Sequence, residues 1–117
     1  MARNQVVHPG GKKMEGLWYT HFTAGPMHGD GMAVLRHGEI LGGDPAHTYS
    51  GSYQFDGPNL YANVRVTPYP AAIASTATER PFTLYLKGSI SGDSAAVCGH
   101  PDNKADLKIA VELHRAA

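Results

Sequence analysis

Short apolar runs separated by glycine-rich turns fill the stretch from Gly29 to Phe55. The last of these runs, residues 47–55, alternates between two faces, one of which carries Tyr49, Gly51, Tyr53 and Phe55. A period of two is typical of a half-buried β-strand. The glycine and polar residues at 36–39, and the glycines, aspartate and proline at 42–45, are typical of tight turns between neighbouring strands. The stretch therefore predicts three short antiparallel strands.

The same alternation continues through most of the chain. The predicted strands cover residues 17–23, 32–35, 39–41, 47–55, 60–67, 82–90, 95–99 and 107–113. Only residues 71–79, between the fifth and sixth of these strands, could form a short helix, and they could equally form a loose crossing loop. Evenly spaced strands joined mostly by tight turns indicate an antiparallel meander.

A set of antiparallel strands protects its edges by closing into a barrel or by packing as a sandwich. Hairpin-length connections favour an up-and-down barrel, and small residues within the strands ease the bending that closure requires. These small residues are Gly31, Gly51, Ala62 and Gly88. We therefore predict an all-β, eight-stranded antiparallel up-and-down barrel with at most one short helix. Such a barrel can be filled by its own side chains or can hold one small ligand, and periodicity leaves both open.

Length and composition limit the organisation and the partners. A chain of 117 residues predicts one barrel domain over 16–117, preceded by a polar lead-in over 1–15 that is either flexible or docked on the barrel. Lys plus Arg and Asp plus Glu number ten each, which argues against a nucleic-acid partner. One cysteine, Cys98, excludes an intrachain disulfide, and no apolar run approaches the length of a membrane span. The expected location is the cytoplasm.

An ordered set of motifs carries a family resemblance. The set consists of Gly16-Leu17-Trp18 with Phe22, Gly29-x-Gly31, Gly38 through Ile40 to Gly42-Gly43-Asp44, and Tyr49-x-Gly51. It resembles the GrlR family, the cytoplasmic negative regulators of type III secretion and their bacterial relatives. The resemblance extends from Gly16 to the C-terminus, and its most specific piece is Gly-Gly-Asp followed five residues later by Tyr-x-Gly.

The resemblance implies a lipocalin-like barrel that forms a homodimer and acts by protein–protein contact with a transcriptional regulator. In the family that contact is associated with an acidic cluster in the turn after the Tyr-x-Gly strand. The corresponding residues here, 54–59, contain only one acidic residue, Asp56. The fold is therefore expected to carry over, whereas that particular partner is not.

Aromatic and aliphatic residues on the inward faces are the candidates for lining a ligand cavity. They are Trp18, Phe22, Tyr49, Tyr53, Ala62, Val64, Phe82 and Leu84. In a barrel the core and the cavity lining occupy the same positions, so this set serves either interpretation. The ligand expected in such a cavity is a small apolar molecule.

The turn motif Gly42, Gly43 and Asp44 has two readings. Consecutive backbone N–H groups could form an anion-binding nest. The favoured reading is that the glycines supply positive φ angles and that Asp44 caps its own backbone.

No motif indicates catalysis. A metal site could be drawn from His21, His28 and His47 with Asp44, but their spacings match no metal-ligand template. No metal and no other cofactor is predicted, nor is an ordered nucleophile, base and acid. The sequence favours a non-enzymatic regulatory or interaction module, and the alternative is a carrier or sensor of a small ligand without a protein partner.

Overall fold

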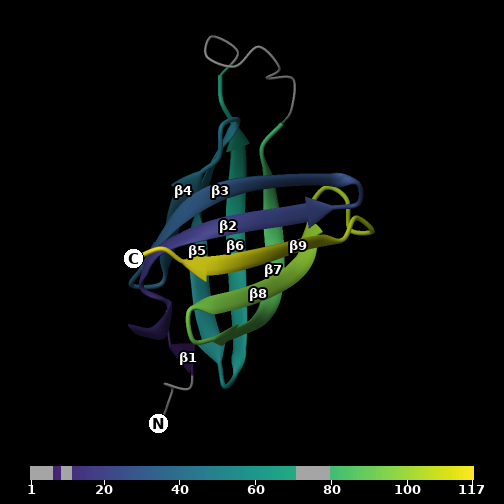
Figure 1. The fold of residues 1–117 in the computed structure, drawn as a ribbon. Helices are drawn as coiled ribbons and strands as arrows, with labels where there is room; N and C mark the ends of the chain where they lie inside the picture. Colours follow the sequence, from purple (N-terminus) through teal and green to yellow (C-terminus); the bar gives the residue numbers. More distant parts are fainter. Residues whose placement is uncertain (1–6, 9–11, 71–79) are drawn as a thin grey trace.

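The computed structural model describes residues 7–8, 12–70 and 80–117, and their main feature is a closed antiparallel barrel (Figure 1). Each strand from β2 to β8 pairs with the next one in sequence, and β9 pairs back onto β2. The barrel strands are β2 (Gly16–Ala24), β3 (Met27–Arg36), β4 (Glu39–Gly43), β5 (His47–Asp56), β6 (Asn59–Pro68), β7 (Phe82–Ser91), β8 (Ser94–Pro101) and β9 (Ile109–Arg115). The predicted eight-stranded up-and-down barrel is confirmed.

Four two-residue turns set the register of the hairpins. Gly25, Gly57 and Gly92 stand first in three of them, each with a φ angle near +60°. In the fourth turn His37 and Gly38 both have positive φ angles, 53° and 82°. Turns with positive φ match the right-handed twist of the flanking strands, so they hold the hairpins in register.

The two ends of the barrel differ. The turn end carries the tight β3–β4, β5–β6 and β7–β8 connections, and the loop end carries the longer β4–β5, β6–β7 and β8–β9 connections. The predicted short helix at residues 71–79 lies outside the described residues. The C-terminus returns to the turn end, where Ala117 O accepts a hydrogen bond from Leu17 N at 2.9 Å (Figure 1).

Inward and outward positions follow the predicted alternation. Along β5, Tyr53 and Phe55 are buried while Ser52 and Gln54 are exposed. Among the inward residues predicted on later strands, Ala62 and Leu84 are buried, while Val64 and Phe82 are half-buried. The alternation therefore fixes which side chains can reach the interior.

The described part of the lead-in docks on the turn end. β1 (Val7–His8) pairs with the end of β5, and the 3₁₀ turn η1 (Lys12–Met14) places Met14 in the interior with no exposed surface. Residues 1–6 and 9–11 of the predicted flexible lead-in lie outside the described residues. Of the two alternatives for the lead-in, docking holds for residues 12–15.

Some predicted boundaries were wrong. β3 begins at Met27 rather than at residue 32, because the ring of Phe22 on β2 covers the backbone of Gly29 across the hairpin and compensates for its missing side chain. β8 extends to Pro101, and β9 begins at Ile109 rather than at residue 107.

The predicted bending role of the small residues has a clear physical basis at two positions. A Cβ on Gly51 would collide with Asn63 O, and a Cβ on Gly88 would collide with Ala96 O. The neighbouring backbone approaches so closely there that only glycine fits.

Candidate functional site

The barrel encloses a cavity of about 640 Å³. Its wall is mainly aliphatic and aromatic and draws on every barrel strand. A volume of several hundred Å³ lined by apolar side chains is typical of a small-molecule site. The question left open by periodicity is therefore answered: the interior is not filled by the barrel's own side chains.

Most of the predicted cavity residues do line this space. Seven of the eight are found on its wall, namely Phe22, Tyr49, Tyr53, Ala62, Val64, Phe82 and Leu84. Trp18 is the exception, because its fully buried side chain belongs to the packing of the turn end. Trp18 is therefore part of the hydrophobic core but does not line the cavity.

The turn end is closed by a plug of three residues, Met14, Trp18 and Arg115. Trp18 Nε1 donates to Met14 O at 2.9 Å, and Met14 itself borders the cavity. The Arg115 guanidinium lies 4.4 Å from the centre of the Trp18 ring. The same guanidinium donates to Lys13 O at 2.6 Å and to Asp93 Oδ1 at 2.7 Å. Arg115 thus joins the lead-in, the tryptophan and the β7–β8 turn.

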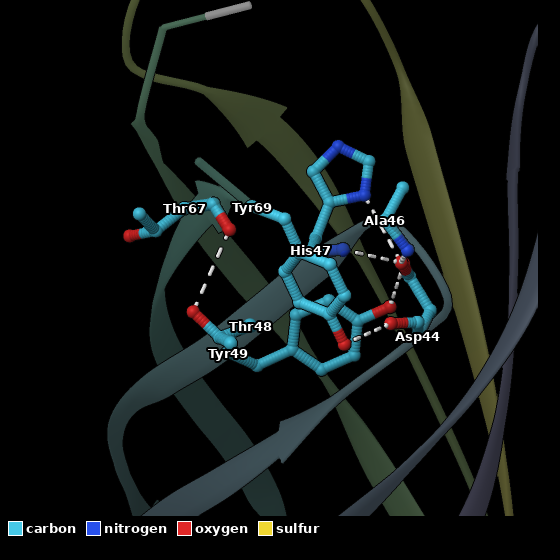
Figure 2. Close-up of polar contacts among 7 residues, drawn as sticks. All are labelled: Asp44, Ala46, His47, Thr48, Tyr49, Thr67 and Tyr69. Carbon is cyan, nitrogen blue, oxygen red and sulfur yellow. Dashed lines mark hydrogen bonds and ion pairs between the residues drawn. The ribbon is translucent and has the colours of Figure 1, made fainter. Parts of the chain in front are cut away.

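A polar cluster stands at the loop end, built around the side chain of Asp44 (Figure 2). Asp44 Oδ1 accepts hydrogen bonds from the backbone N–H groups of Ala46 and His47, each at 2.8 Å, and lies 3.1 Å from His47 Nδ1. Asp44 Oδ2 accepts a short hydrogen bond from the Tyr49 hydroxyl. The Tyr69 hydroxyl donates to Asp44 O at 2.9 Å. We call Asp44, His47, Tyr49 and Tyr69 the Asp44 cluster.

The electrostatics of the cluster keep Asp44 charged and Tyr49 neutral. Burial acts to raise the pKa of Asp44, but the hydrogen bonds from Tyr49, Ala46 and His47 outweigh it and leave that pKa below its ordinary value. Burial and the adjacent Asp44 carboxylate raise the pKa of Tyr49 far above its ordinary value. Tyr49 is consequently a permanent donor to Asp44 near neutral pH.

The structure decides between the two readings of the turn motif. Asp44 caps the backbone of its own turn, as predicted. The predicted positive φ angles at Gly42 and Gly43 are wrong, because both residues belong to β4 and neither has a positive φ. They are glycines for lack of room: a Cβ on Gly42 would collide with Met32 O, and one on Gly43 would stand 2.8 Å from His47 O.

Two polar atoms inside the barrel lack partners. Thr20 Oγ1 and the Tyr53 hydroxyl are buried, and neither forms a hydrogen bond with any described residue. Both residues border the cavity. Buried hydroxyl groups are usually hydrogen-bonded, so an unpartnered one calls for an explanation.

Sequence reasoning missed Thr20, Met14 and Arg115. Thr20 shares the inward face of Trp18 and Phe22, so alternation alone could have placed it in the interior. The sequence around Met14 and Arg115 carries no motif that would identify them, because their roles depend on contacts with Trp18 in the folded chain.

The ring centres of His21 and His28 lie 6.0 Å apart, but the described histidines do not form a metal site. His21 pairs with Asp30 at 2.7 Å and His47 with Asp44, and among the described residues no three His, Cys, Asp or Glu side chains form a group able to hold a metal ion. In the same part of the chain, no helix is both long and apolar enough to cross a membrane.

Comparison with known proteins adds no further constraint. No protein-family model matches the chain, and a search of curated proteins found no match.

Proposed function

We propose that the chain is a non-enzymatic binding module that encloses a small, largely apolar molecule inside its barrel. The observation that carries this proposal is the apolar cavity of about 640 Å³. Burial of apolar surface is the main source of affinity in such a site, and a few polar groups orient the ligand. The hydrogen bonds of Asp44 favour a structural rather than a catalytic role for this residue, since its carboxylate already accepts from Ala46, His47 and Tyr49.

The resemblance to the GrlR regulators supports a regulatory use of this binding. Its most specific motif, Gly42-Gly43-Asp44 with Tyr49-x-Gly51, contains both partners of the hydrogen bond between Asp44 and Tyr49. The motif therefore has a physical role in this barrel. A carrier that releases its ligand without a protein partner is the alternative use of the same cavity.

Blocking the cavity should abolish binding of an apolar probe. Ala62 is buried on the cavity wall, so an Ala62→Phe side chain would occupy the space that a ligand needs. We expect the dissociation constant of the neutral fluorophore N-phenyl-1-naphthylamine to rise by roughly tenfold or more, a loss of about 1.4 kcal/mol or more. Fluorescence titration measures it.

The matched control is the same substitution on the outer surface. Ala96 on β8 is exposed, so Ala96→Phe should leave probe binding unchanged. Urea unfolding of both variants shows that each is folded. Equal binding by the wild type and Ala62→Phe would place the probe outside the barrel and contradict the proposal.

An apolar patch on the outer face favours a second function, self-association. Four exposed side chains of β2, β3 and β4 make up this outer patch: Tyr19, Met32, Val34 and Leu41. Tyr19 pairs with Met32 across β2 and β3, and Val34 pairs with Leu41 across β3 and β4. Met32 and Val34 are two residues apart on β3, so the four side chains are contiguous. Contiguous exposed apolar surface marks an interaction site.

We propose that a second copy of the chain covers the outer patch. An isologous dimer places one patch against its own copy, which an apolar and uncharged surface permits. The equal numbers of acidic and basic residues add no net repulsion between copies. The family resemblance points to the same homodimer.

A charge in the outer patch should separate the copies. Val34 and Tyr85 are both 46% exposed, but Tyr85 lies on β7, away from the patch. We expect sedimentation velocity at micromolar concentration to show a dimer for the wild type and for Tyr85→Lys, and a monomer for Val34→Lys. A monomeric wild type, or a dimer that survives Val34→Lys, contradicts this interface and leaves the cavity proposal untouched.

A further inference from the structure

The unpartnered hydroxyl of Thr20 is a guide to the chemistry of the ligand. The residue is only 8% exposed and lies in the middle of β2, on the cavity wall. Among the described residues nothing donates to or accepts from its Oγ1. A buried hydroxyl without a partner destabilises a protein, whereas one that meets a ligand contributes to recognition.

A recess beside Thr20 brings a second hydroxyl to the same place. Thr20 pairs with Gly31 on β3, which has no side chain to cover the barrel wall there. A Cβ on Gly31 would stand 2.7 Å from Gly43 O, 3.0 Å from the Tyr49 hydroxyl oxygen and 3.2 Å from Thr20 Oγ1. Two hydroxyl groups from β2 and β5 thus converge over one glycine, and we call this place the Gly31 recess.

The hydrogen bonds already present decide what the recess can accept. The Tyr49 hydroxyl donates its only proton to Asp44, so toward the recess it can offer only lone pairs and accept a hydrogen bond. The Thr20 hydroxyl can rotate and donate its proton. A ligand group that donates to Tyr49 and accepts from Thr20 satisfies both side chains, and a hydroxyl group does this with a single oxygen.

We infer that the ligand is an apolar molecule bearing a hydroxyl group, which binds in the Gly31 recess between Thr20 and Tyr49. This inference rests on the proposed function of the cavity. A carboxylate fits the recess poorly, because it has no proton to give Tyr49 and would approach the negative charge of Asp44.

Another class of ligand has some support at the loop end. Arg80 and Lys104 border the cavity there, and neither forms an ion pair with a described residue. They would favour a carboxylate head group. Both side chains are exposed, however, so water competes with any such contact. The carboxylate is therefore the alternative that the experiment must separate.

The test compares three probes that carry a phenyl group on a short alkyl chain. They are 4-phenylbutanol; pentylbenzene, in which a methyl replaces the hydroxyl; and 4-phenylbutanoate, in which a carboxylate replaces the terminal CH2OH group. Each displaces N-phenyl-1-naphthylamine from the wild type and from Thr20→Val, which keeps the shape of the side chain and removes the hydroxyl. We expect Thr20→Val to weaken 4-phenylbutanol by roughly three- to tenfold, the size of one neutral hydrogen bond, and to leave pentylbenzene unchanged. Thr20→Ser should restore binding of the alcohol.

Other outcomes overturn the inference. An equal effect of Thr20→Val on the alcohol and the hydrocarbon would mean that the substitution acts through shape alone. If 4-phenylbutanoate binds the wild type more tightly than the alcohol and loses its affinity in Arg80→Gln or Lys104→Gln, the ligand is an anion held at the loop end. Failure of the fluorophore itself to bind would instead contradict the proposed function, and the inference would fall with it.

The stability of Thr20→Val gives a second readout. Because Thr20 Oγ1 has no partner among the described residues, its removal should leave the midpoint of urea unfolding unchanged or raise it. A lowered midpoint would show that the hydroxyl serves the fold rather than a ligand.

Discussion

Trp18→Ala is expected to lower the free energy of unfolding by about 3–5 kcal/mol, the range for deleting a large buried aromatic side chain. Trp18 has no exposed surface and is the largest fully buried side chain among the described residues. The substitution also removes the donor to Met14 O and the ring that faces Arg115. Since small domains are stable by only about 5–15 kcal/mol, the variant should unfold at a much lower urea concentration. Circular dichroism measures this unfolding, because it does not depend on the fluorescence of the deleted tryptophan.

Two further variants separate the contributions of Trp18. Trp18→Phe keeps much of the apolar volume but leaves Met14 O without its donor, so it should cost less than Trp18→Ala. Tyr85→Ala removes a large aromatic residue that is 46% exposed on the outer face, and it should change stability by less than about 1 kcal/mol. A loss below about 1 kcal/mol for Trp18→Ala would contradict the plug at the turn end.

The barrel was predictable because its signals are local. Alternation along residues 47–55 depends only on which side chains face the interior, and turns such as His37-Gly38 depend on residues that tolerate positive φ. Both signals can be read from residues that are consecutive in the sequence. A chain built from hairpins therefore reveals its fold class without any knowledge of distant contacts.

The missed features depend on contacts between distant residues. The first half of β3 contains Gly29, Asp30 and Gly31, which taken locally indicate a turn. They form a strand because β2 pairs with them along its length and the ring of Phe22 covers Gly29. Met14 is equally unmarked, since its burial depends on docking of the lead-in against Trp18.

The cavity was predictable in its residues but not in its existence. Inward positions such as Ala62 and Phe82 follow from alternation, but periodicity cannot tell a lined space from a filled one. The reason is that occupancy depends on the barrel's diameter and on which end the bulky residues fill. Here Trp18 and Met14 close the turn end, and the cavity extends from Met14 to the loop-end residues Asp44 and His47.

Asp44→Asn should lower the free energy of unfolding by roughly 1.5–3 kcal/mol near neutral pH, the value of hydrogen bonds to a charged group. The Asp44 side chain is only 7% exposed, and it accepts hydrogen bonds from Ala46, His47 and Tyr49. An asparagine keeps one acceptor oxygen, but its amide group cannot accept the proton of Tyr49. The β4–β5 turn should therefore lose its side-chain hydrogen bond to Tyr49 on β5.

The same substitution should alter the dependence of stability on pH. Because the pKa of Asp44 is lower in the folded state, its contribution is present above its ordinary pKa of about 3.9 and is lost as the pH falls through the folded value. Tyr49 has the opposite sign. Its raised pKa gives a contribution that is present below about pH 10 and is lost at higher pH. Asp44→Asn should flatten the acid limb of this curve.

Urea unfolding at a series of pH values measures both effects, with Asp56→Asn as the matched control. Asp56 ends the same strand, β5, but its side chain is exposed, so its loss should change stability by less than about 0.5 kcal/mol at any pH. Tyr49→Phe tests the pair directly, because it removes the donor and keeps the ring. If Asp44 and Tyr49 act as one unit, the double variant should cost clearly less than the sum of the two single variants. Additive losses, or an acid limb that stays as steep in Asp44→Asn as in the wild type, would show that the hydrogen bond between them does not stabilise the loop end.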